Sequence, residues 1–104
     1  MMDLDLADFT AAVTSRATGW QKAGVQWQLH HGPTSSKSSA WVDCTTVHHL
    51  AQLIVWTSGE AELSIGNIST GAIAITIYEI SNATELAACF DDLTSRLTSP
   101  AARA

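Results

Sequence analysis

The spacing of apolar positions changes along the chain and predicts a helix at each end. Within residues 4–24 the apolar residues recur at helical spacing, at positions 6, 9, 13, 17 and 20. Asp3 or Asp5 is available to cap this helix and to complement its dipole. The capping-box sequence Asn82-Ala83-Thr84-Glu85 opens a second predicted helix, whose apolar stripe runs over residues 86–97.

Between these helices, apolar and polar residues alternate with a period of two, which predicts five strands. The first covers residues 25–31 and stops at Gly32-Pro33; the others cover residues 40–46, 50–57, 61–68 and 72–80. Thr57-Ser58-Gly59 is predicted to be a three-residue hairpin loop with Gly59 in the left-handed conformation. This loop would place Trp56 directly opposite Glu60, which sets the pairing register of the two strands that it joins.

Short connections make consecutive strands neighbours, so the order helix, strands, helix predicts an α+β fold. We expect an antiparallel meander sheet of about five strands, with the N-terminal and C-terminal helices packed on one face. The 104 residues are enough for a single domain, 1–104, with one two-layer core. Residues 1–3 and 99–104 are expected to fray, and the serine-rich segment 33–39 is expected to be a mobile loop.

Alternation also predicts which face of the sheet each side chain occupies. The side chains expected under the helices are those of Val42, Cys44, Leu53, Val55, Leu63 and Ile75. Those expected on the open face are Trp41, Asp43, Gln52, Ile54, Trp56, Glu60, Glu62 and Tyr78. A slip of one residue in register would invert the assignment for a strand.

Tryptophans among carboxylates on an uncovered sheet face are typical of a protein-binding surface. Aromatic anchors ringed by acids suit a partner rich in arginine or lysine. The alternative interpretation is that each tryptophan simply lies across neighbouring strands. Trp20 and Trp27 lie on buried stripes and are assigned to the core. The candidate partner-binding residues are Trp41, Asp43, Ile54, Trp56, Glu60, Glu62 and Tyr78.

Charge and composition narrow the class of partner. Ten acidic and five basic side chains give a net charge of −5, which disfavours nucleic acid and would steer in a basic protein. The apolar runs are too short to cross a bilayer, and acids stand where a signal peptide would carry basic residues. Cys44 and Cys89 form no metal-type spacing and are expected to be buried, reduced thiols. We therefore expect a cytoplasmic protein with no membrane contact.

No catalytic motif is present, so the sequence predicts a protein that is not an enzyme and that needs no cofactor. The pairs His30-His31 and His48-His49 raise a metal hypothesis. Adjacent residues on a strand point to opposite faces, so these histidines are interpreted as exposed or loop residues, and no metal site is predicted. Asp91-Asp92 is interpreted as part of a solvated helix face.

Two segments carry a family resemblance, Ser39-Ala40-Trp41-Val42-Asp43 and the stretch LIVWTSGEAEL at residues 53–63. They resemble the TriTu immunity proteins of bacterial polymorphic toxin systems, small cytoplasmic proteins taken to neutralise a cognate toxin. The leading helix with Trp20, the strand at Tyr78-Glu79 and the final helix follow that layout. The resemblance implies neutralisation by binding, and the acidity of the chain fits a basic toxin. A small acidic secretion chaperone or assembly adaptor is the alternative, and the sequence leaves open a monomer or a homodimer.

Overall fold

The computed structural model describes residues 5–32 and 38–98, and the statements below concern these residues. The expectations for the chain ends and for residues 33–37 of the loop fall outside these ranges. The predicted α+β fold is confirmed. The elements are, in order, α1 Leu6–Lys22, β1 Gln26–His31, β2 Ser39–Thr45, β3 His49–Trp56, β4 Glu60–Asn67, β5 Ile73–Glu79 and α2 Ala83–Leu97.

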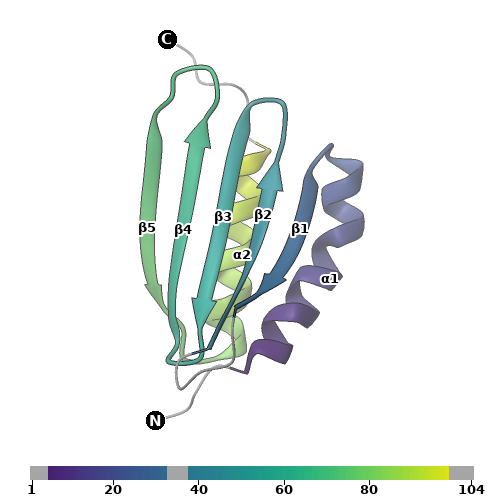
Figure 1. Cartoon of the computed structure of the whole chain (residues 1–104). Helices are drawn as coiled ribbons and strands as arrows, with labels where there is room; N and C mark the ends of the chain where they lie inside the picture. The colour runs from purple at the N-terminus through teal and green to yellow at the C-terminus, as the bar shows by residue number, and fades with distance from the viewer. Residues whose placement is uncertain (1–4, 33–37, 99–104) are drawn as a thin grey trace.

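The five strands form one antiparallel sheet in the order β1-β2-β3-β4-β5, and both helices lie on one face of it (Figure 1). The predicted hairpin joins β3 to β4, where Val55 pairs with Ala61. Gly59 has a φ of +94°, and a Cβ at this position would lie 2.7 Å from the carbonyl oxygen of Ile80. Glycine is therefore required here both by the backbone conformation and by a close approach.

Side-chain caps fix the beginning of each helix. The carboxylate of Asp5 accepts a hydrogen bond of 2.8 Å from the N–H of Ala7 at the start of α1. At α2, the amide oxygen of Asn82 accepts from the N–H of Glu85 at 2.9 Å. The Glu85 carboxylate in turn accepts from the N–H of Ser81 at 2.6 Å. These bonds satisfy backbone donors that have no partner inside the helix.

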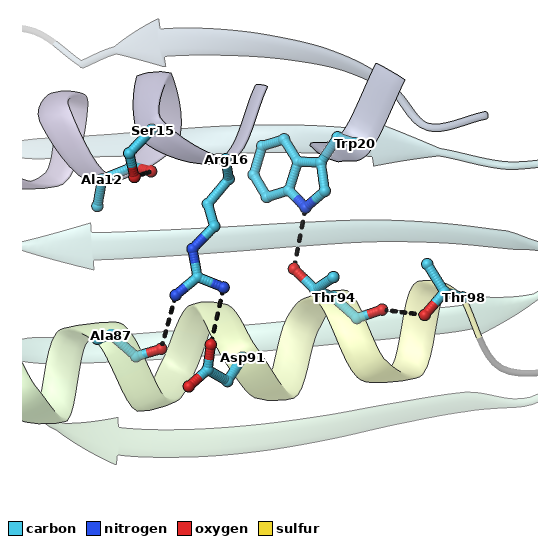
Figure 2. A network of polar contacts seen from close by, with 8 residues as sticks. All are labelled: Ala12, Ser15, Arg16, Trp20, Ala87, Asp91, Thr94 and Thr98. Atoms are coloured by element: carbon cyan, nitrogen blue, oxygen red, sulfur yellow. Dashed lines mark hydrogen bonds and ion pairs between the residues drawn. The ribbon is translucent and has the colours of Figure 1, made fainter. Parts of the chain in front are cut away.

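The two helices contact each other through an aromatic and polar network (Figure 2). The indole N–H of Trp20 on α1 donates to the Thr94 hydroxyl on α2 at 2.9 Å, and its ring lies 6.1 Å from the ring of Phe90. Arg16 reaches across to the Asp91 carboxylate at 2.8 Å and donates to the carbonyl of Ala87. α1 and α2 therefore form a connected layer over the sheet.

The core lies between this layer and the sheet, as predicted for β2, β3 and β4. Trp20 is buried and Trp27 packs against the core from β1. Cys44 and Cys89 are buried and free. Burial raises the pKa of the Cys44 thiol to about 12 and that of Cys89 to about 11. The correctly predicted core residues of the sheet are Val42, Cys44, Leu53, Val55 and Leu63.

The face prediction was wrong for β5. Ile75 pairs with Ser64 of β4, so it lies on the open face and is 61% exposed. Tyr78 pairs with Ala61, a core residue, and its hydroxyl donates a hydrogen bond to the carboxylate of Asp92 on α2. Ile75 and Tyr78 therefore occupy the faces opposite to those expected.

The β4–β5 connection explains this inversion. The side-chain oxygen of Asn67 accepts the N–H groups of Ser69 and Thr70, and its own N–H donates to the carbonyl of Ala72. This turn fixes the register in which Ile73 pairs with Gly66. Because β5 stands to the side of the helix layer (Figure 1), burial does not decide which of its faces is apolar.

Candidate partner-binding face

The open face is the side of the sheet away from the helices, and the register arranges its side chains in rows across the strands. All the predicted partner-binding residues except Tyr78 belong to it. One row consists of His30, Trp41, Ile54, Glu62 and Ile77, from β1 to β5. The adjacent row consists of Gln28, Asp43, Gln52, Ser64 and Ile75.

An aromatic cluster lies on the open face of β1, β2 and β3, and consists of His30, Trp41, Asp43 and Gln52. The rings of His30 and Trp41 stack, with 5.2 Å between centroids and 18° between planes. The Asp43 carboxylate lies 3.2 Å from Nε2 of His30 and accepts a hydrogen bond of 3.1 Å from the Gln52 amide. Trp41 is half-buried and rests on the neighbouring strand, which agrees with the alternative interpretation for this tryptophan.

His30 is a member of the cluster that the candidate list lacked. Alternation over residues 25–31 had already placed it on the polar side of its strand. What identifies it is the pairing of His30 with Trp41 in the β1–β2 ladder. That pairing depends on the length of the connecting loop, so the sequence pattern alone did not reveal it.

The β3–β4 hairpin end of the face is acidic. Trp56 is half-buried at the end of β3, and Ile54 pairs with Glu62 on the adjacent strand. Glu60 pairs directly with Glu79 of β5. These pairings place acidic side chains of β4 and β5 together at the hairpin end of the face.

The opposite end of the face carries an apolar depression of about 360 Å³. Gly66, which has no side chain, forms part of its lining between Leu50 on β3 and Ile73 on β5. Both flanking side chains are exposed, Leu50 by 54% and Ile73 by 71%. Sequence reasoning missed this hollow because the alternation that put Ile75 under the helices puts Ile73 there as well.

The remaining titratable side chains in the described ranges do not gather into a larger cluster. His49 is only 7% exposed, which corrects its interpretation as an exposed or loop residue, and its Nδ1 has no hydrogen-bond partner among the described residues. Asp91 binds Arg16, whereas the neighbouring Asp92 binds Tyr78 and Arg96. Within residues 5–32 and 38–98, no three histidine, cysteine or carboxylate side chains come together as a metal site would require.

The helices are also too short or too polar to cross a bilayer: none in the described part of the chain meets the requirement for a membrane span.

A comparison with curated proteins gives no match. The family model described as "Immunity protein TriTu" matches residues 7–96, from the first turn of α1 to the last turn of α2. This match confirms the resemblance seen in the sequence and includes every strand of the sheet. The chain belongs to the TriTu family of immunity proteins.

Proposed function

We propose that this immunity protein binds a cognate toxin through the open face of its sheet and thereby blocks the toxin's active site or substrate groove. Membership of an immunity-protein family supports a toxin as the partner. The observation that carries the choice of surface is the register, which gathers aromatic and acidic side chains on a face without helices. The interface residues we propose are Trp41, Asp43, Ile54, Trp56, Glu60 and Glu62.

The apolar members would hold the complex together. Trp56 and Ile54 are two residues apart on β3 and so lie on the same face. Trp41 pairs with Ile54 from the adjacent strand. Aromatic anchors at the centre of an interface cost about 2–4 kcal/mol on truncation, mainly through faster dissociation. Truncating Trp41 would also disturb His30, which stacks on it, so both tryptophans are tested.

The acidic members would set the rate of association. The net charge of −5 and the carboxylates near the hairpin would attract a basic toxin over a distance comparable to the Debye length. Glu62 and Glu60 lie at this end of β4. The two buried free cysteines support the cytoplasmic location that we propose for the protein.

Surface plasmon resonance against a candidate toxin from the genomic neighbourhood, at low and physiological salt, tests this proposal. We expect Trp56→Ala to accelerate dissociation roughly thirtyfold or more while leaving association nearly unchanged. Replacing Glu60 and Glu62 by glutamine should slow association and flatten its salt dependence.

Two matched controls lie away from the proposed interface. Val47→Ala removes apolar surface from an 84% exposed residue between β2 and β3, and Asp8→Asn removes one charge from α1. Both variants should bind like the parent. If folded Trp41→Ala and Trp56→Ala variants bind and protect cells as well as the parent does, the open face is not the inhibitory surface.

A further inference from the structure

β5 is an edge strand whose free backbone groups can be assigned residue by residue. The N–H of Ile80 donates to Gly59, and the carbonyl of Ala72 accepts from Asn67, so positions of even number bond to β4. In an antiparallel ladder, the intervening residues direct their N–H and C=O groups away from the partner strand. The backbone groups that point to the outer edge therefore belong to Ile73, Ile75, Ile77 and Glu79.

Among residues 5–32 and 38–98, this edge shows none of the features that usually prevent strand addition. Natural edges carry lysine, proline, a bulge or a covering element. β5 reads Ile-Ala-Ile-Thr-Ile-Tyr-Glu and pairs with β4 without interruption from position 73 to position 79. Its isoleucines are 71%, 61% and 65% exposed in chain order. A long, apolar, uninterrupted edge of this kind is a template for another strand.

We propose that β5 pairs antiparallel with β5 of a second copy of this chain, around a two-fold axis at Ile75, so that the two sheets become one continuous sheet. Ile75 is suited to the axis because its N–H and C=O both point outward. Two copies would then form a hydrogen-bonded Ile75–Ile75 pair.

The side chains of β5 are self-complementary in this register. On the open face, Ile73 of one copy would pair with Ile77 of the other, so isoleucine meets isoleucine along the whole edge. On the covered face, the large Tyr78 would lie opposite the small Ala72 of the second copy. The pattern fits large residues against small ones on one face and builds a continuous apolar band on the other.

Charge also favours a second copy over a basic partner at this edge. The only charged residue of β5 is Glu79, at its end, so a basic strand would find no carboxylate along the isoleucines. The two-fold axis places the two Glu79 residues roughly 27 Å apart, at about 3.4 Å per residue. This distance exceeds the Debye length of about 8–10 Å, so repulsion between the two Glu79 carboxylates opposes the pairing little.

The helices leave space for this pairing. A two-fold axis normal to the sheet puts the helices of both copies on one side and both open faces on the other. α2 lies behind the middle of the sheet and β5 stands to the side of it (Figure 1). The pairing leaves Trp56 and Glu62 uncovered, so it is independent of the toxin-binding proposal.

Cysteine crosslinking tests the axis directly. In the proposed pair the Ile75 Cα atoms are about 5.5 Å apart, within the usual disulfide range of about 4.4–6.8 Å. Ile75→Cys should therefore form a disulfide-linked dimer under mild oxidation. Ile73→Cys or Ile77→Cys alone should not, because like positions would be roughly 14 Å apart, but a mixture of the two should crosslink. Cys44 and Cys89 are buried with raised pKa values, so the native thiols should contribute no background.

Sedimentation equilibrium of the full chain gives a second measurement. The wild type should dimerise reversibly in the micromolar range, and added salt should strengthen the dimer by screening two chains of charge −5. Ile75→Lys should weaken dimerisation at least about tenfold, since like charges would meet at the axis. Leu50→Lys makes the same change on the open face away from the edge and should leave the dimer intact.

Ile75→Pro covers the case in which the lysine variant does not fold. It removes an outward N–H but no bond to β4, so the strand should form and the dimer should not. A wild type that stays monomeric throughout the micromolar range overturns the proposal. The same holds if β5 pairs with the toxin and not with a second copy. The proposal is also overturned by a dimer lost with Leu50→Lys but kept with Ile75→Lys, or by efficient crosslinking through Ile73→Cys alone.

Discussion

The two edges of the sheet are built differently, although the sequences of both edge strands show an alternation with a period of two. At β1, the helix α1 lies alongside: the N–H of Val25 donates to the carbonyl of Trp20, and the His31 ring lies 3.2 Å from the Thr10 hydroxyl. The open-facing side chains of β1 are polar. At β5, the open-facing side chains are isoleucines, and Tyr78 donates a side-chain hydrogen bond to Asp92 in the helix layer.

This difference shows that apolar residues in one sheet can serve two purposes. Those of β2, β3 and β4 are covered by the helices and make the core. The isoleucines of β5 lie on the opposite face, outside that core, and only Tyr78 of this strand packs against it. The folding free energy should therefore be concentrated in the covered strands, while β5 depends on its ladder with β4 and on the contact of Tyr78 with α2.

The largest expected contrast is between a residue of the covered region and one of β5. Trp20→Ala should lower the free energy of unfolding by about 3–5 kcal/mol, because it opens a cavity beside Phe90 and removes the bond to Thr94. Ile75→Ala should change it by no more than about 0.5 kcal/mol in the monomer. Urea denaturation followed by circular dichroism, at a concentration that keeps the chain monomeric, measures both. Equal losses would show that β5 is part of the cooperative core.

Tyr78→Phe should have the next largest effect. The variant keeps the ring but removes the hydroxyl that donates to Asp92, at an expected cost of about 1–2 kcal/mol. Hydrogen exchange should locate the change: the amides of Ala74 and Thr76, which bond to β4, should exchange faster, whereas those of β3 should not. Uniform acceleration over the sheet would contradict the view that β5 is attached separately.

The same hydroxyl should make stability depend on alkaline pH. Burial, and next the hydrogen bond and charge of Asp92, raise the pKa of Tyr78 above its ordinary value of 10.0. Its contribution is therefore complete below pH 10 and is lost as the pH rises from 10 towards the higher pKa of the folded state. The raised thiol pKa values of Cys44 and Cys89 also lower stability as the pH rises above 9, in the wild type and in Tyr78→Phe alike. Stability above pH 10 should fall more steeply for the wild type than for Tyr78→Phe, and parallel curves would refute this role.

The sequence predicted the parts of the fold in which local and tertiary preferences agree. Asn82 was identified as a cap, and Asp5 was one of the two acids named for the first helix, because few side chains satisfy helix donors. The β3–β4 hairpin was predicted in its register because Gly59 restricts the loop. The faces of β2, β3 and β4 followed from alternation, since the helices cover these strands.

The sequence failed where only tertiary structure decides. Nothing in its pattern shows that the helix layer stops short of β5, so Ile75 was expected in the core. Tyr78 combines an apolar ring with a polar tip and suits either face. Its position is decided by Asp92, which belongs to a later element. The contact of His30 with Trp41 likewise required the β1–β2 register.

The smallest expected effect concerns the polar link between the helices. Arg16 and Asp91 form an ion pair of 2.8 Å, but the Asp91 side chain is 71% exposed, so solvent screens the pair. A double-mutant cycle with Arg16→Gln and Asp91→Asn should give a coupling of about 0.2–1 kcal/mol that diminishes in high salt. Arg16→Gln alone should cost more than Asp91→Asn, because Arg16 also donates to Ala87 and lies 5.8 Å from the Phe90 ring. A salt-independent coupling larger than the loss in Tyr78→Phe would mean that surface charge, rather than packing around Trp20, holds the helix layer together.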